Sequence, residues 1–212
     1  MTRTLSSLSI SLDGFVAGPD QSLNDPLGVG GMRLHQWVFE TAEWARREGL
    51  APRAPTPDSE VFERTQANMG AFVMGRHMFS PGRGEWDMSW RGWWGEDPPY
   101  HTPVFVLTHH PRAPLPMAGG TTFHFVTDGI ESALAQARAA AGDKDVLVAG
   151  GAQAVRQSIR AGLLDELFLH IVPVALGAGE RLLDDVGDPH LEPVEVIASP
   201  AVTHIRYRIA RP

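Results

Sequence analysis

Two segments of the chain place glycine directly after a run of apolar residues, and this arrangement has a chemical use. The first is residues 73–78 (VMGRHM), and the second is residues 146–153 (VLVAGGAQ). If each run is a strand followed by a helix, glycine lets the backbone approach a pyrophosphate and the helix offers free N–H groups. Arg76 adds a planar guanidinium that suits phosphate. Together, the two segments are able to hold a dinucleotide from two sides.

A pair of glycines after a strand is also common as a tight turn that touches no ligand. Neither segment carries the G-x-G-x-x-G fingerprint, and the sequence contains no G-x-x-x-x-G-K-[ST] P-loop. The residues alone therefore indicate an α/β protein with a candidate nucleotide site. They do not decide between a binding site and a turn.

The sequence argues against several other kinds of active site. It has no cysteine, which excludes disulfides, thiolate zinc sites and cysteine nucleophiles. No H-E-x-x-H occurs, and His109 and His110 are neighbours that do not easily share one metal, so we expect no metal site. No G-x-S-x-G elbow is present, which argues against a serine hydrolase of that type.

Charge and hydropathy limit the partners in the same way. The net charge is −7 and Lys and Arg form no basic stripe, so we expect no nucleic-acid partner. No run of 18 apolar residues occurs, so we expect no membrane span. Residues 4–12 alternate apolar and polar side chains, unlike a signal peptide, and a cytoplasmic protein is the expectation.

Hydrophobic periodicity and turn residues give the order of elements along the chain. Apolar runs predict strands at residues 4–11, 71–74, 104–108, 121–127, 145–149, 167–174, 194–198 and 202–209, and residues 15–17 are expected to form a short extended piece. Helical spacing predicts a helix of about three turns over residues 34–45 and another that starts at residues 56–58 (TPD). Further helices are expected from a capping box at residues 128–131 to Gly142, and directly after Gly151.

Strands that alternate with helices predict a mainly parallel sheet covered by helices on both faces. The last two runs predict an antiparallel pair, so the sheet is expected to be mixed. We therefore expect a single domain over residues 1–212, with a three-layer α/β architecture.

Several motifs, in one order along the chain, resemble those of the dihydrofolate reductase superfamily. Residues 72–77 (FVMGRH) look like the M-G-R-x-T/S stretch of dihydrofolate reductases. The reductase domain of riboflavin biosynthesis, including its stand-alone relatives, is similar at residues 11–18, 150–153, 162–167, 170–174 and 176–179. The resemblance covers roughly residues 4–185. It implies a dihydrofolate-reductase-like fold and hydride transfer from NADPH.

The resemblance also implies a role for each matching residue. Ala17 and Gly18 would lie by the nicotinamide; Gly75, Arg76 and His77 would hold the 2′-phosphate and pyrophosphate; Leu107 and Thr108 would flank the adenosine; and Gly150, Gly151, Ala152 and Gln153 would bind the pyrophosphate from the second junction. Arg76 favours NADPH over NADH, because a 2′-phosphate suits a guanidinium.

The substrate side departs from the family. Dihydrofolate reductases bind the pterin through an acidic residue on the first long helix, and the candidates here are Glu40 and Glu43, on a helix with the bulky Trp37. Trp37, Glu40 and Leu176 are the candidate substrate contacts. Asp13 is the candidate catalytic residue, as a proton donor or a hydrogen-bonding anchor, although Asp-Gly is more often only a turn.

Residues 80–103 are expected to form a long loop, which the riboflavin-pathway enzymes that the chain resembles need not have. It contains Trp86, Trp90, Trp93 and Trp94. These side chains could form a lid that stacks on a heterocycle, a dimer contact, or local packing of the loop on itself. The sequence leaves these three alternatives open.

The expected function is NADPH-dependent reduction of a small heterocycle. The most similar named activity is reduction of 5-amino-6-(5-phosphoribosylamino)uracil in riboflavin biosynthesis. The alternatives are reduction of dihydrofolate or another pterin, binding of NADPH without turnover, and an interaction module that uses the tryptophan-rich loop. The resemblance also implies a homodimer.

Overall fold

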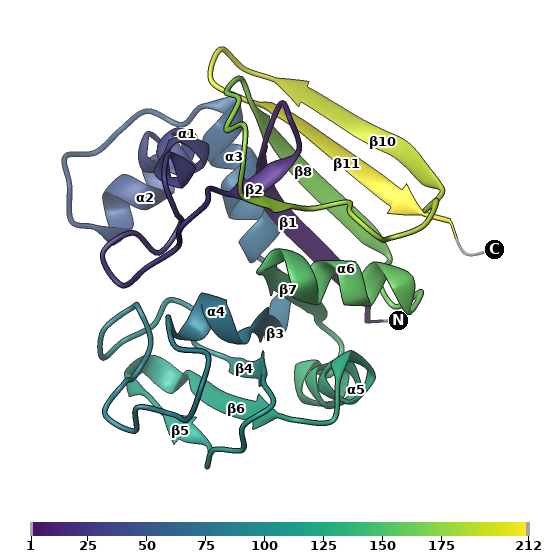
Figure 1. Ribbon diagram of the computed structural model, residues 1–212. Helices are drawn as coiled ribbons and strands as arrows, with labels where there is room; N and C mark the ends of the chain where they lie inside the picture. The colour runs from purple at the N-terminus through teal and green to yellow at the C-terminus, as the bar shows by residue number, and fades with distance from the viewer. Residues whose placement is uncertain (1, 211–212) are drawn as a thin grey trace.

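The computed structural model describes residues 2–210, which form a mixed sheet, a short two-stranded ribbon and helices on both faces of the sheet (Figure 1). The strands are β1 Thr4–Ser11, β2 Phe15–Ala17, β3 Met69–Gly75, β4 Pro103–Leu107, β5 Leu115–Pro116, β6 Thr122–Val126, β7 Asp145–Gly150, β8 Glu166–Val172, β9 Glu180–Arg181, β10 Leu191–Ala198 and β11 Thr203–Ile209. The helices are α1 Gln36–Phe39, α2 Ala42–Arg47, α3 Pro57–Gln66, α4 Arg76–Phe79, α5 Ile130–Ala141 and α6 Ala152–Arg160, with 3-10 turns at Gly31–His35 and Ala118–Gly120.

The strand order of the large sheet is β10-β11-β8-β1-β7-β3-β4-β6-β5. The strands from β8 to β6 in this order pair in parallel. The edge strands β11, β10 and β5 pair antiparallel to their neighbours. The predicted mixed, mostly parallel sheet with an antiparallel closing pair is therefore confirmed. Strands β5 and β9 are too short to give a periodic signal, and the sequence did not predict them.

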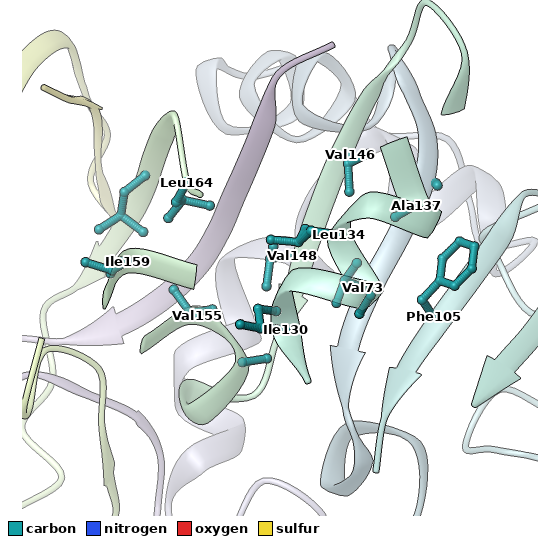
Figure 2. Packing of buried hydrophobic residues seen from close by; sticks show 14 of the residues in the cluster. Val73, Phe105, Ile130, Leu134, Ala137, Val146, Val148, Val155, Ile159 and Leu164 are labelled. Atoms are coloured by element: carbon teal, nitrogen blue, oxygen red, sulfur yellow. The ribbon is translucent and has the colours of Figure 1, made fainter. Parts of the chain in front are cut away.

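Side chains alternate between the two faces of the sheet, and each face has its own core. On one face, Ala71 and Val73 of β3 pack with Leu134 of α5 and Val155 of α6 (Figure 2). On the other face, Phe72 packs with the loop that follows α4 and with β4 and β6. A central strand buried on both sides needs apolar residues at every position, which is why β3 reads as a continuous apolar run.

The predicted helix over residues 34–45 is wrong in one respect, because the structure breaks it into a 3-10 turn, α1 and α2. The break lies at Thr41, whose backbone is extended, with φ −72° and ψ 155°. The Thr41 hydroxyl accepts a hydrogen bond from the Trp44 amide at 3.2 Å. Threonine thus caps a new helix where the apolar spacing alone suggests a continuous one.

The two other predicted helix starts have different outcomes. At α3 the prediction is confirmed, because the Thr56 hydroxyl accepts from the Ser59 amide at 3.2 Å and Pro57 stands in the first turn. At α5 the capping box is wrong. Gly129 is the N-cap, and the Asp128 carboxylate instead accepts from the Ser132 hydroxyl at 3.4 Å.

A row of polar groups crosses the sheet beneath α3. Ser7 Oγ of β1 lies 2.8 Å from Nε2 of His170 of β8, and His170 Nδ1 lies 2.7 Å from Nδ1 of His204 of β11. His204 Nε2 lies 3.0 Å from the Asp58 carboxylate of α3. The row joins strands β1, β8 and β11 to α3, so helix and sheet are held in one relative position. Within residues 2–210, no helix has the length and apolar character needed to cross a membrane.

The buried histidines predict how stability depends on pH. Burial lowers the pKa of His170, and the charges of His204 and His35 lower it further. Burial also lowers the pKa of His204, where Asp58 opposes the shift and Arg64 adds to it. In the unfolded chain each pKa returns to about 6.5. The unfolded chain therefore binds more protons below that pH, so this stabilisation is complete above about pH 6.5 and is lost as the pH falls.

We expect the free energy of unfolding to decrease between about pH 7 and pH 5, by up to ~1.4 kcal/mol per pH unit for each histidine. Urea titrations at several pH values measure this slope. His204→Gln, which removes one titrating ring, should make the slope shallower than that of the wild type. A free energy of unfolding that stays constant or increases toward pH 5 would contradict the interpretation.

Candidate functional site

The carboxyl ends of the parallel strands lie along one edge of the sheet. Strand β7 ends at Gly150, its neighbour β3 ends at Gly75, and β4 ends at Leu107. The two glycine junctions singled out in the sequence are thus side by side on adjacent strands. In open α/β sheets this edge is where ligands bind.

The junction after β7 leaves the start of α6 open. A Cβ at Gly75 would lie 3.6 Å from the Gly151 amide nitrogen, so the two junctions are close together. The Gly150–Gly151 peptide is cis, and no described side chain caps α6. Gly151 is exposed, and a Cβ there would meet no atom of residues 2–210 within 4 Å beyond its chain neighbours. The first amides of α6, at Ala152 and Gln153, have no partner within the helix, so an anion is able to approach them.

Arg76 follows the end of β3, and its guanidinium lies over an indole ring. Its guanidinium carbon is 3.9 Å from the centre of the Trp86 ring, and its Nη2 donates to the Gly84 carbonyl. Burial lowers the pKa of Arg76 and the charge of Glu85 raises it, yet a guanidinium stays protonated in proteins. Nε and Nη1 are buried and make no hydrogen bond to the described residues, and the positive charge of Arg76 suits an anionic ligand.

His77 is exposed and lines a small polar cavity between two loops. The cavity measures about 40 Å³, and its walls include Gln21 and Ser22 of the loop after β2, and Arg83 and Trp93 of the tryptophan-rich loop. Burial and the charges of Arg83 and Arg76 lower the pKa of His77, while Glu180 opposes the shift. The loop after β2 therefore reaches across to the β3 junction.

Asp13 holds the loop that follows β8. Its carboxylate accepts from the Gly177 amide at 2.7 Å, from the Leu176 amide at 3.1 Å, and from the Ser11 hydroxyl at 2.6 Å. These bonds, led by that of Ser11, lower the pKa of Asp13 to about 2. The group is ionised at neutral pH, where it has no proton to donate. Of the two roles considered for Asp13, the geometry favours the anchor.

The β2–β9 ribbon packs its backbones without room for side chains. Ala17 pairs with Glu180, and a Cβ at Gly179 would lie 2.0 Å from the Ala17 carbonyl oxygen. A Cβ at Gly18 would lie 2.0 Å from the Val29 carbonyl oxygen, in the loop after β2. Ala17 and Gly18 thus occupy a tightly packed crossing near the end of β1.

The end of β4 lies against the loop that carries Trp86. The Thr108 hydroxyl accepts from the His110 amide at 3.1 Å, and Trp86 Nε1 donates to the His110 carbonyl at 2.8 Å. Leu107 and Thr108 are therefore on the side of the site where Arg76 rests on Trp86.

The candidate substrate contacts are not brought together. Leu176 lies beside Asp13, as described above. Trp37 is buried, and its Nε1 donates to the Ser9 hydroxyl at 2.9 Å, so its side chain belongs to the core under α1. Glu40 projects into solvent, where its carboxylate lies 3.5 Å from Arg53. Neither Trp37 nor Glu40 lines either of the two cavities described for residues 2–210.

Three of the four loop tryptophans pack on the core. Trp86 and Trp94 contact the cluster around Phe79 and Phe123, and Trp90 Nε1 donates to the Phe79 carbonyl at 2.7 Å. This arrangement supports local packing among the three alternatives. Trp93 differs, because it also lines the cavity beside His77.

Two arginines of this region were not singled out in the sequence. Arg156 of α6 is buried, and its Nη2 lies 3.4 Å from the carboxylate of Glu180 on β9. The sequence signal that could have pointed to Arg156 is its place beside Val155 and Ile159, the apolar residues of the buried face of α6. Arg83 lies in a loop, where periodicity gives no signal. No group of three metal-binding side chains occurs among residues 2–210.

The tight ribbon predicts a difference between two glycine substitutions. Gly179 and Gly177 both have positive φ, 130° and 76°, so alanine is strained at either position. Only at Gly179 would the new Cβ also collide with a backbone oxygen. We expect Gly179→Ala to destabilise the fold by about 1–3 kcal/mol more than Gly177→Ala. Thermal unfolding of the two variants measures the difference, and equal losses would show that the ribbon is looser than described.

Comparison with known proteins places this geometry in a family. The family model of the RibD C-terminal domain matches residues 4–205. A search of curated proteins finds no match. A candidate riboflavin biosynthesis protein from Shewanella sp. PV-4 has a similar structure, with a TM-score of 0.66 and 19% identity over 99% of this chain and 100% of that one.

Two further solved structures share the fold. Dihydrofolate reductase from Enterococcus faecalis, complexed with NADP(H), gives a TM-score of 0.55 and 15% identity over 99% of this chain and 97% of that one. The deaminase/5-amino-6-(5-phosphoribosylamino)uracil reductase of Thermotoga maritima gives 0.54 and 14%, and the match covers 99% of this chain but 57% of that longer one. The fold is thus dihydrofolate-reductase-like, and the chain belongs to the RibD C-terminal domain family.

Proposed function

We propose that this protein is an NADPH-dependent reductase of a small heterocyclic substrate. The observation that carries the proposal is the meeting of the two glycine junctions on adjacent strands, with the charged Arg76 directly after the first of them. Membership of the RibD C-terminal domain family supports it, as does the shared fold with a dihydrofolate reductase that is complexed with NADP(H).

The residues at the carboxyl edge fit such a cofactor. Arg76 and His77 would meet its 2′-phosphate and pyrophosphate, and the open start of α6 from Gly150 to Gln153 would meet the pyrophosphate from the other side. Leu107 and Thr108 would flank the adenosine, and Ala17 and Gly18 the nicotinamide. The bound cofactor supplies the hydride. The chain supplies binding and orientation, and Asp13 acts as a positioning residue that holds the loop at Leu176.

The substrate we propose first is 5-amino-6-(5-phosphoribosylamino)uracil or a related pyrimidine. Reduction of dihydrofolate is less well supported, because Glu40 points to solvent and pairs with Arg53. An interaction module built on the tryptophan-rich loop is also less well supported, because Trp86, Trp90 and Trp94 are packed on the core. We further propose a homodimer, which light scattering of the purified protein would measure.

Titration of NADPH and NADH into the wild type and Arg76→Ala tests the cofactor. We expect NADPH to bind more tightly than NADH, and Arg76→Ala to weaken NADPH by about 10- to 100-fold, since hydrogen bonds to charged groups contribute about 1.5–3 kcal/mol. NADH should be affected much less, because it lacks the phosphate. Arg91→Ala, which removes an arginine paired with Glu96 elsewhere on the loop, is the control and should leave both affinities unchanged.

The same titration separates the alternatives. Tight NADPH binding followed by oxidation of NADPH with a pyrimidine or pterin substrate identifies a reductase. Binding without oxidation across that substrate panel would favour a nucleotide-binding protein without turnover. Absence of binding of either dinucleotide would overturn the proposal.

A further inference from the structure

A second cavity lies on the face of the sheet that α3 covers, away from the carboxyl edge. It measures about 170 Å³ and opens near the amino ends of β3, β7 and β8. Its apolar wall is formed by Leu5, Met69, Leu147 and Phe168. The polar groups that line it include Ser7, Asn68 and three arginines, Arg3, Arg64 and Arg206.

Ser7 connects this cavity to the buried row of polar groups. Its side chain is partly exposed and lines the cavity, while its Oγ lies 2.8 Å from His170 Nε2. The row continues from His170 to His204, whose Nδ1 atoms lie 2.7 Å apart. It ends at the Asp58 carboxylate, 3.0 Å from His204 Nε2. A hydroxyl, two imidazoles and a carboxylate are thus in hydrogen-bonding sequence, with the hydroxyl at the accessible end.

One set of protonation states satisfies the whole row. An ionised Asp58 only accepts, so His204 Nε2 carries the hydrogen and donates. Neutral His204 then accepts at Nδ1, and His170 must donate from its own Nδ1. His170 Nε2 is left with its lone pair facing Ser7, so the Ser7 hydroxyl donates to it. Burial, which lowers the pKa of both histidines, keeps them in this neutral state at neutral pH.

We propose that Ser7 is a nucleophile in a second site of this protein, with His170 as its general base. A serine becomes reactive when a base in hydrogen-bond reach is itself oriented by a third group. Here His170 is the base, and His204 and Asp58 orient it. No sequence motif indicates this role, because Ser7 lies within strand β1 and not on a G-x-S-x-G turn.

The step that this arrangement supports is acyl transfer from a carboxylic ester. Ser7 Oγ attacks the ester carbonyl carbon as its proton passes to His170 Nε2, and a tetrahedral intermediate forms. The C–O bond to the alcohol then breaks, and His170 returns the proton to the leaving oxygen. Water hydrolyses the acyl-serine by the same route. Asn68 also lines the cavity, and the second N–H of its side-chain amide, beside the one that donates to Asp145, is the donor we assign to the oxyanion.

The lining of the cavity indicates the class of ester. The arginines at its rim are already paired: Arg3 with Asp145 and Glu166, and Arg64 and Arg206 with Glu195. Their charges are balanced, so the site does not favour an anionic substrate. Its volume and apolar wall suit a group about the size of benzene, which an apolar cavity of about 150 Å³ accepts. The substrate class is therefore a small, neutral aryl or alkyl ester.

The test uses 4-nitrophenyl acetate as the probe, with release of 4-nitrophenol followed by absorbance and the acetylated residue mapped by peptide mass spectrometry. We expect acetylation of Ser7 in the wild type. Ser7→Ala should lower the protein-dependent rate by about 100-fold or more, the scale of general-base catalysis. Ser9→Ala is the matched control on the same face of β1, where Ser9 accepts from Trp37, and it should retain the rate.

Circular dichroism of each variant confirms that it is folded. If Ser7→Ala does not fold, the mapped residue in the wild type decides alone. An acetyl group found on lysine, histidine or the amino terminus but not on Ser7 would overturn the proposal. An equal rate in the wild type and in folded Ser7→Ala would also overturn it, as would the absence of any acetylation.

Discussion

The parallel pairing of β1, β7 and β3 is the constraint on which the rest of the structure depends. Strands β3 and β7 are buried on both faces, so their register is fixed by apolar side chains that alternate between two cores, and β1 pairs in parallel with β7. Because the strands are parallel, the turns that follow them must emerge at one edge. Gly75 and Gly150 therefore lie side by side because the core fixes the pairing of β3 and β7, and not because of the turns themselves.

The residues at that edge show how packing prepares groups for a ligand. Arg76 is held over the Trp86 ring by a cation–π contact and by its hydrogen bond to Gly84, and both contacts restrict its side chain. The Asp13 carboxylate accepts hydrogen bonds from two amides of the loop after β8, so these bonds position that loop without any ligand. An arginine that is already oriented loses less conformational freedom when an anion binds. The tryptophan-rich loop supplies Trp86, which packs on the core and in turn holds Arg76 in place.

The order and type of the long elements could be predicted from the sequence, because their apolar periods match their burial. Strand β1 and helix α3 are found where the pattern placed them. The errors come from local polar chemistry: Thr41 caps a helix inside an apolar pattern, and Asp128 bonds Ser132 instead of an amide. Hydrophobic periodicity reports only whether each side chain is apolar or polar. It carries no information on which group a hydroxyl or carboxylate will hydrogen-bond.

Contacts between distant segments account for what else the sequence missed. The stacking of Arg76 on Trp86, the Arg156–Glu180 pair and the row from Ser7 to Asp58 each join segments that no local pattern connects. Their residue types were visible, but their proximity depends on strand order. The candidate site residues at positions 75–77 and 150–153 could be proposed from the sequence because each group is local.

Hydrogen–deuterium exchange with and without NADPH tests the central claim, that a dinucleotide binds between the two junctions at the carboxyl edge. We expect slower amide exchange in residues 75–79 and 150–156 when NADPH is present, with no change in the β10–β11 hairpin at residues 191–209. Unchanged exchange in both junctions at saturating NADPH, or protection confined to other segments, would contradict it.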